Sequence, residues 1–285
     1  MEDDHQQQKG FWQPHTSSID FCEPNYAIVD SIVEIHNVWS SLLFISGLGV
    51  WGLYKGNPSQ EWRFTISYTI LILIGIGSAC LHGTLHWIFQ SSDEVPMLYI
   101  VICLGYSVFE CETPRHTHNN YKTCGGSILL AIVITIVYYR FQSLYFMFLG
   151  TFTISTIVAT IGLIKIVYKT QTKTNCPHVT RLFWMGELYF VGVGTSVWIL
   201  DMLLCEQIVL PMTNNTMLGW FKGITPHVLW HLAAALGTYV LTSSLCCCRL
   251  AALHIPYHVS YHLGGMIPII HTKNSETGIS PKKNT

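Results

Sequence analysis

Three histidines and one aspartate lie within or beside long apolar segments of this chain, where ionisable side chains are costly. His82 lies near the end of one apolar segment, His227 and His231 open another, and Asp93 follows the first segment after a short polar break. A polar group at membrane depth is unfavourable unless it has a partner, so ionisable residues there are candidates for function. Three imidazoles that leave one coordination position open form the ligand set of a catalytic zinc ion.

The spacing of these residues supports a shared metal ion. His227 and His231 are four residues apart, which places both on one face of a helix. Ser78 has the same spacing from His82, so its hydroxyl should lie beside that ligand. The chain has 14 histidines, so chance pairs are expected, and His82 with His86 forms another. For any one histidine alone, an interfacial or hydrogen-bonded role is the alternative.

Zinc with three histidine ligands lowers the pKa of a bound water to about 7, which makes water a nucleophile. Asp93 would accept the proton of that water and pass it to a leaving nitrogen. Ser78 would donate a hydrogen bond to an oxyanion. The alternative role for Asp93 is that of a helix N-cap beside Glu94.

The composition indicates a multi-spanning membrane protein. Of 285 residues, 50% are hydrophobic and only 11% are charged, whereas soluble chains carry about 25% charged residues. The net charge of -1 suggests no nucleic-acid partner. The first thirty residues show no apolar signal segment, so the first spanning helix is expected to direct insertion.

The apolar segments predict an all-α fold, a bundle of seven transmembrane helices. A stretch from 126 to 168 is about twice a bilayer width and must hold two helices, divided at Arg140–Ser143, the first of them unusually short. The other five expected helices cover roughly residues 32–54, 64–89, 93–110, 181–204 and 226–249.

The distribution of positive charge predicts a lumenal N-terminus and a cytosolic C-terminus. With that orientation, only Lys9, Arg140 and Lys222 of the 15 lysines and arginines lie on the lumenal side. The three histidines and Asp93 then share the lumenal leaflet, although nearly 150 residues separate His82 from His231. That shared depth favours the metal site over separate structural roles.

Other sequence features fit this orientation. Asn214 begins an N-glycosylation sequon on the lumenal side, where Cys22 and Cys205 also fall and could form a disulfide. Cys246–Cys248 fall at the cytosolic end of the last helix, either as palmitoylation sites or as free interfacial thiols. Residues 251–285 are expected to be a disordered cytosolic tail.

Oxygen-bearing side chains gather just before the first spanning helix. Asp20, Glu23 and Asn25 lie close together, and Glu34 follows at the helix start. Calcium takes six to eight such oxygens, but the spacing is not that of an EF-hand. From the residues alone, a solvated acidic loop is favoured.

Several motifs in order resemble those of the alkaline ceramidases, seven-helix intramembrane zinc amidases related to the adiponectin receptors. The resemblance covers roughly residues 10–250 and rests on Gly10-Phe11-Trp12, Ile19-Asp20-Phe21-Cys22-Glu23-Pro24-Asn25-Tyr26, Gly77-Ser78-Ala79-Cys80-Leu81-His82, Asp93-Glu94-Val95-Pro96-Met97, Asp201-Met202-Leu203-Leu204-Cys205-Glu206 and Pro226-His227-Val228-Leu229-Trp230-His231.

This resemblance implies a zinc site of His82, His227 and His231, with Ser78 and Asp93 assisting catalysis. It also implies a calcium site whose ligands are Asp20, the Phe21 carbonyl, Glu23, Asn25 and Glu34. Phe21 stands where the family often has Trp, and His86 is an additional histidine near the site.

The implied activity is hydrolysis of the ceramide amide bond to a sphingoid base and a fatty acid, in the endoplasmic reticulum or Golgi membrane. Residues 1–31 would form a lumenal segment and residues 32–250 the catalytic domain. No obligate protein partner is evident. The alternative is a heptahelical receptor of the adiponectin-receptor kind with little hydrolase activity.

Overall fold

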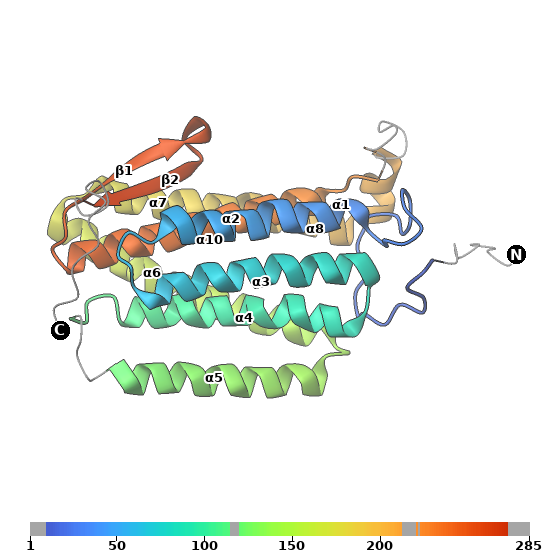
Figure 1. Ribbon diagram of the computed structural model, residues 1–285, viewed down its shortest axis with the longest axis horizontal. Helices are drawn as coiled ribbons and strands as arrows, with labels where there is room; N and C mark the ends of the chain where they lie inside the picture. Colours follow the sequence, from blue (N-terminus) through green and yellow to red (C-terminus); the bar gives the residue numbers. More distant parts are fainter. Residues whose placement is uncertain (1–9, 115–119, 213–220, 222, 273–285) are drawn as a thin grey trace, which may run out of the picture.

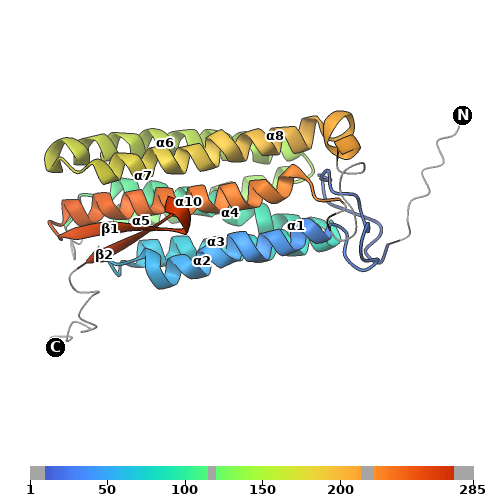
Figure 2. The same cartoon turned by 90° about the horizontal axis from the view of Figure 1, so that it is seen from above.

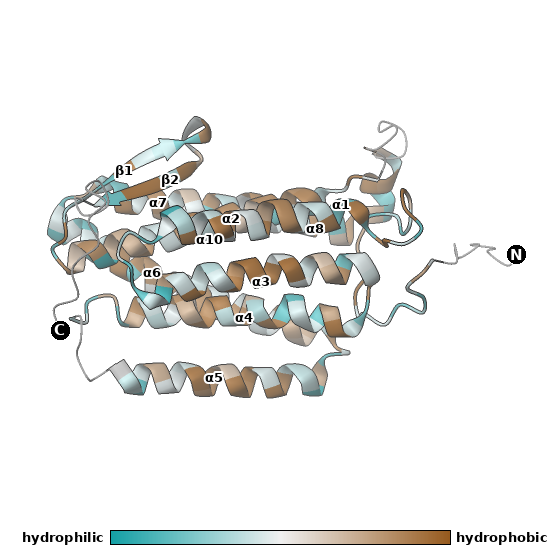
Figure 3. Cartoon of the chain, viewed as in Figure 1, coloured by the Kyte–Doolittle hydropathy of each residue, from teal (hydrophilic) through white to brown (hydrophobic). Residues whose placement is uncertain are grey.

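Long antiparallel helices form the bundle in this computed structural model, which describes residues 10–114, 120–212, 221 and 223–272 (Figure 1). Six helical stretches of the described residues are long and apolar enough to cross a membrane. They are α3 (Trp62–Thr84), α4 (Trp87–Phe109), α5 (Asn120–Phe141), α6 (Tyr145–Thr174), the stretch Pro177–Leu203 and α10 (Pro226–Ala252). Apolar residues run along all the long helices (Figure 3), and many of them are exposed, among them Leu73 and Ile154, as contact with hydrocarbon requires.

A further helical run precedes α3. It alternates between α-helix and wider π-helix, as α1 (Ile35–Ser40), η1 (Ser41–Ser46), α2 (Gly47–Trp51) and η2 (Gly52–Gly56). This run packs closely on α3: a Cβ atom at Gly52 would lie only 2.1 Å from Cδ1 of Tyr68. The irregular segment from residue 10 to Glu34 lies at the end of the bundle opposite the C-terminal strands (Figure 1).

The turn between α3 and α4 falls earlier than the sequence predicts. Leu85 adopts left-handed backbone angles (φ 49°, ψ 43°) and ends α3. The next helix then begins at Trp87. The expected boundaries of 64–89 and 93–110 are therefore wrong, because an uninterrupted apolar run hides a turn made by a non-glycine residue. Asp93 consequently lies inside α4, in its second turn.

The long apolar stretch does contain two helices, divided close to the predicted break. However, α5 already begins at Asn120 and has 22 residues, so the expected short helix is wrong. The first turn of α5 is polar, so the apolar pattern in the sequence does not indicate where the helix begins. This helix lies at the lower edge of the bundle in Figure 1 and beneath other helices in the view from above of Figure 2, and little of its surface is buried.

The stretch Pro177–Leu203 consists of α7 (Pro177–Glu187), the π-helical η3 (Leu188–Thr195) and α8 (Ser196–Leu203), and the short η4 (Cys205–Val209) follows it. This stretch packs against α10, the most buried of the candidate spans. Glycines permit the close contact, since a Cβ at Gly237 of α10 would lie 2.8 Å from the backbone nitrogen of Phe190.

The C-terminal region contains two β-strands. The predictions of an all-α fold and of a disordered tail from residue 251 are therefore wrong for this region. Strands β1 (Tyr257–His262) and β2 (Ile267–Thr272) form an antiparallel hairpin in which Tyr257 pairs with Thr272. A short 3-10 turn, η6 (Leu263–Gly265), joins them. Tyr239 of α10 donates a hydrogen bond to the Pro268 carbonyl at 2.7 Å, which fastens the hairpin to the bundle. Residues 273–285 lie outside the described residues.

Cys246, Cys247 and Cys248 lie in the interior of the bundle. Each is 0% exposed and belongs to the largest hydrophobic cluster, together with Tyr239 and Leu250. Palmitoylation and an interfacial position both require accessible sulfur atoms, so the structure excludes both readings. These thiols act as small apolar core side chains.

Candidate metal centre and active site

Three buried histidine rings converge near the end of the bundle that carries the N-terminal segment. His82 lies in the last turn of α3, while His227 and His231 lie in the first turns of α10. All are at most 2% exposed. One ligand atom from each lies within 4.8 Å of the others, the one such group among the described residues. With Zn–N bonds of about 2.0–2.1 Å, one ion could bind all three after a small closing movement.

Hydrogen-bond partners orient two of the rings. Glu34 Oε2 lies 2.5 Å from Nδ1 of His82. The Nε2 atom of His82 is buried without a partner among the described residues. Ser40 Oγ lies 2.8 Å from Nδ1 of His231. A histidine that bonds a carboxylate or hydroxyl through one nitrogen presents the other to a metal. The donor set and the unpartnered nitrogen therefore fit a zinc ion.

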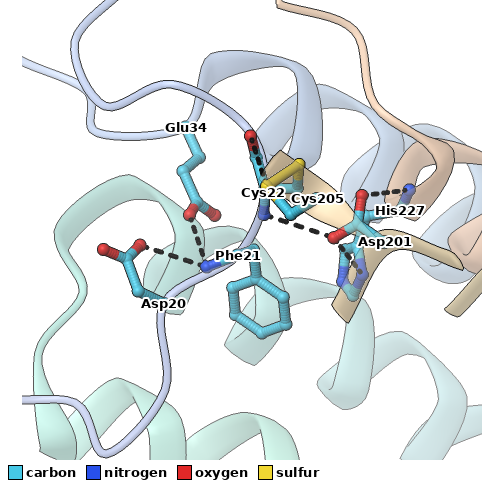
Figure 4. The surroundings of a disulfide bond; sticks show 7 residues. All are labelled: Asp20, Phe21, Cys22, Glu34, Asp201, Cys205 and His227. Atoms are coloured by element: carbon cyan, nitrogen blue, oxygen red, sulfur yellow. Dashed lines mark hydrogen bonds and ion pairs between the residues drawn. A yellow bond between two sulfur atoms is a disulfide. The ribbon is translucent and has the colours of Figure 1, made fainter. Parts of the chain in front are cut away.

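Asp201 positions the third histidine through the backbone. Its Oδ1 atom accepts a hydrogen bond from the backbone N–H of His227 at 3.2 Å, and its Oδ2 lies 3.9 Å from Nδ1 of that ring. Oδ2 also accepts from the backbone N–H of Cys22 at 3.2 Å (Figure 4). This intramembrane acid thus ties α8 and the N-terminal segment to the first turn of α10.

Ser78 and Asp93 face a cavity that begins at the histidines. The cavity measures about 420 Å³ and is lined by His227 and His231 as well as by both of these side chains. Oγ of Ser78 lies 3.0 Å from Oγ of Ser41. Asp93 is not an N-cap, because α4 begins six residues earlier and its cap is His86, whose Nδ1 accepts from the Ile88 N–H at 3.4 Å. His86 is not part of the converging histidine group.

Close packing at Gly77 brings α3 against α4 beside these two residues. A Cβ atom at Gly77 would lie 2.1 Å from the Ser92 carbonyl oxygen and 2.9 Å from the Asp93 backbone nitrogen. Both neighbours are backbone atoms of a helix and cannot rotate away. The distance between Ser78 and Asp93 therefore depends on glycine at this position.

We expect Gly77→Ala to push the helices apart, lowering stability by about 1–3 kcal/mol and hydrolysis by up to about a hundredfold through misplacement of Asp93. Melting temperature in detergent and turnover measure the two effects. Gly105→Ala on α4 is the matched control, since nothing lies within 4 Å of its Cβ position. A Gly77→Ala protein with normal melting and turnover would contradict this role.

The residues expected to bind calcium lie together, but their ligand atoms do not form a converging group like that of the histidines. Asp20 Oδ2 accepts from Asn25 Nδ2 at 3.3 Å, and the Phe21 N–H lies 3.1 Å from Asp20 Oδ1 and 3.3 Å from Glu34 Oε1. The buried Oδ1 of Asn25 has no partner among the described residues.

Glu23 caps the first helix. Its carboxylate oxygens accept from the backbone N–H groups of His36 at 2.7 Å and Asn37 at 2.8 Å. Burial raises the pKa of Glu23 to about 8, although these bonds oppose the shift. A nearby cation would favour the ionised form of the Glu23 carboxyl group. The acidic segment is therefore suited to binding a cation.

A disulfide joins Cys22 to Cys205, just beyond the end of α8 (Figure 4). Phe21 precedes Cys22 in the chain, and its ring centroid is 4.5 Å from that of His82 and 4.4 Å from that of His227. The ring therefore packs on two of the three converging histidines. Asn214 lies outside the described residues.

Sequence reasoning missed the contacts of Glu34 with His82 and of Ser40 with His231. Forty-eight residues separate the first pair and 191 the second, and neither spacing carries a periodic signal. Asp201 lies within the span expected over residues 181–204, and an acid there needs a partner, but no sequence pattern indicates its contact with the α10 N-terminus.

The fold and the site define a membrane-embedded helical protein with a buried three-histidine centre open to an apolar cavity. The model of the family described as Ceramidase matches residues 13–270. Relatives include Alkaline ceramidase 3 of Mus musculus, 27% identical over 81% of this chain and 84% of that protein. Alkaline ceramidase of Arabidopsis thaliana is 27% identical over 94% and 97%, respectively. Alkaline ceramidase YPC1 of Saccharomyces cerevisiae is 28% identical over 86% and 81%.

The chain belongs to the Ceramidase family, and the predicted resemblance is confirmed. It is a hydrolase of the ceramidase class.

Proposed function

We propose that this protein is a zinc-dependent intramembrane hydrolase that cleaves the amide bond of ceramides to a sphingoid base and a free fatty acid. The observation that carries the proposal is the junction of the histidine centre with an apolar cavity, which Ser78 and Asp93 also line. Such a cavity suits a lipid whose polar amide must reach the metal while its alkyl chain stays out of water.

His82, His227 and His231 would hold the zinc ion, which supplies Lewis acidity and makes water nucleophilic near neutral pH. The carboxylate of Asp93 takes the proton of the attacking water and returns it to the leaving nitrogen. The hydroxyl of Ser78 donates to the carbonyl oxygen as negative charge develops there.

Identification of both products tests the reaction. Purified protein incubated with ceramide should release fatty acid and sphingoid base in equal amounts. Matched release of both separates an amidase from a receptor of the adiponectin-receptor kind, which would release little of either. Absence of release with every ceramide tested would refute the proposed reaction.

We also propose that Asp20, the Phe21 carbonyl, Glu23, Asn25 and Glu34 hold a calcium ion that supports the metal centre. The contacts of Asp20 with Asn25 and Phe21, and the buried amide oxygen of Asn25, support this assignment. Calcium would fix the N-terminal segment to α1. It would thereby also fix the positions of Phe21, which packs on the His82 ring, and of Glu34, which bonds that ring.

Asp20→Asn should raise the calcium concentration needed for full hydrolysis by at least about tenfold, since it removes an anionic ligand. Glu34→Gly should instead impair hydrolysis at every calcium level, because Glu34 also bonds His82. Calcium titration of turnover distinguishes the two, with the exposed Asp30→Asn as control. The calcium site would be refuted if chelation of calcium did not change wild-type hydrolysis and Asp20→Asn matched the wild type at every calcium level. The acidic segment would then be only a solvated loop.

For membrane topology, we propose that the helical run from Ile35 to Gly56 is a seventh span, with a lumenal N-terminus and a cytosolic C-terminus in the endoplasmic reticulum or Golgi membrane. The bias of positive residues supports this orientation. The N-terminal segment and the C-terminal hairpin lie at opposite ends of the bundle (Figure 1), as an odd number of spans requires. The disulfide of Cys22 with Cys205 also suits an oxidising lumen.

A further inference from the structure

The cavity continues far beyond the metal centre, along the length of α10. Residues of α10 that line it run from His227 to Leu245. Eighteen residues of helix correspond to about 27 Å. Most of the wall is apolar, as an alkyl chain requires.

Several polar side chains interrupt this apolar wall beyond the histidines, among them Thr153 and Thr238, and one group of them contains an acid. Glu187 at the end of α7, with Thr156 and Thr160 on α6, lines the same cavity, and the Thr160 hydroxyl donates to Glu187 Oε1 at 3.3 Å. We refer to these three residues as the polar cluster. The Thr156 hydroxyl is buried and has no partner within the described part of the chain.

Thr156 and Thr160 differ in their hydrogen bonds from several other threonines of α6. Thr151 and Thr172, also on α6, donate their hydroxyl protons to the carbonyl oxygen four residues earlier, at 2.8 and 2.9 Å. This bond is the usual way for a threonine to satisfy its hydroxyl within an apolar helix. Thr156 and Thr160 make no such bond within the described part of the helix. The Thr160 hydroxyl bonds Glu187, and the Thr156 hydroxyl, which has no partner there, is available to the cavity.

Packing of α7 on α10 fixes the depth of the polar cluster. A Cβ atom at Gly186 would lie 2.7 Å from Cγ of Leu241, so Glu187 lies near the level of Leu241. Leu241 follows His231 by ten residues, which is about 15 Å along the helix. Carbon–carbon bonds of about 1.5 Å with near-tetrahedral angles advance an extended alkyl chain by about 1.25 Å per atom. The cluster therefore lies about twelve carbons from the metal centre.

Neither the proposed reaction nor helix packing accounts for an acid at this depth. No ion pair to Glu187 occurs among the described residues, and its one hydrogen bond comes from a neutral hydroxyl. An acid within a membrane-spanning segment is costly to retain and commonly contacts water or a ligand. Here the accessible space beside it is the cavity itself.

We infer that the polar cluster sets the acyl-chain preference of the enzyme. This inference rests on the proposed hydrolysis of ceramides. The acyl chain begins at the reacting carbon, so its length determines whether it reaches Glu187. A short chain leaves water on the carboxyl group and on the Thr156 hydroxyl. A chain longer than about twelve carbons displaces that water and offers no hydrogen bond in return, which is unfavourable.

The test measures kcat/KM over ceramides with one sphingoid base and acyl chains shorter than, equal to and longer than about twelve carbons. Glu187→Leu should raise the ratio of long-chain to short-chain kcat/KM by about tenfold relative to wild type, since a polar group no longer loses its water. Thr156→Val, which keeps the side-chain shape, should shift the ratio in the same direction by a smaller factor. Thr172→Val is the matched control, because its hydroxyl is bonded within α6 outside the cavity.

Chain-length profiles of Glu187→Leu and Thr156→Val that parallel the wild type would overturn the inference. So would a shift that follows the length of the sphingoid base rather than that of the acyl chain. If the Glu187→Leu protein does not fold, the chain-length profile of Thr156→Val alone tests the inference. A wild type that cleaves no ceramide of any length would overturn the proposed function itself, which separates the two failures.

Discussion

His231→Ala is expected to remove the bound zinc and to lower hydrolysis by more than about a hundredfold. Loss of an outer partner of a metal ligand already costs about 10–100-fold in metal affinity or activity, and loss of a ligand should cost more. The substitution also leaves Ser40, which lies 2.8 Å from the His231 ring, without that contact. Metal analysis of the purified variant and turnover measured on the same sample give the two values.

His86→Ala is the control for this prediction. His86 is a neighbouring histidine, but it caps α4 and does not belong to the converging group. Its replacement should cost some stability and leave zinc unchanged. Undiminished zinc in His231→Ala would contradict the assignment of the ligands.

Asp93→Asn should keep the zinc and lose about 10²- to 10⁴-fold in turnover, the usual contribution of a general acid–base group. The amide preserves the shape of the side chain but cannot accept the proton. The structure strengthens this expectation, because Asp93 lines the cavity with Ser78 and does not cap a helix. Turnover at saturating ceramide, with zinc content measured in parallel, checks it.

Glu112→Gln makes the equivalent change at an exposed acid that pairs with Lys169 and Lys173, and it should leave turnover unchanged. Near-normal turnover in Asp93→Asn would mean that another group moves the proton.

The convergence of the three histidines was predictable from the sequence, because it follows from residue spacing and from the order of the helices alone. The spacing of His227 and His231 and the shared depth of His82 required no tertiary model. By contrast, Glu34 reaches His82 across 48 positions and Asp201 reaches the α10 N-terminus through a backbone N–H. Side-chain-to-backbone contacts of this kind leave no pattern in the residue order.

The fold was predictable wherever apolar segments end in polar breaks, as at Arg140–Ser143. It was not predictable at Leu85, where a leucine takes a left-handed conformation that is unfavourable for its type. The C-terminal hairpin was missed although Tyr257, Val259 and Tyr261, which pack on the core, alternate with polar residues, because the whole tail was interpreted from its overall polarity. Its position depends on Tyr239, which donates to the Pro268 carbonyl, and this contact appears only in the folded chain.

Removal and return of zinc on a single preparation is the most direct test of the central claim that the three histidines form a catalytic zinc centre. The account predicts about one zinc per chain, loss of ceramide hydrolysis in proportion to the zinc removed by a chelator, and recovery in proportion to the zinc restored. Full hydrolysis by protein from which the zinc has been removed would contradict it.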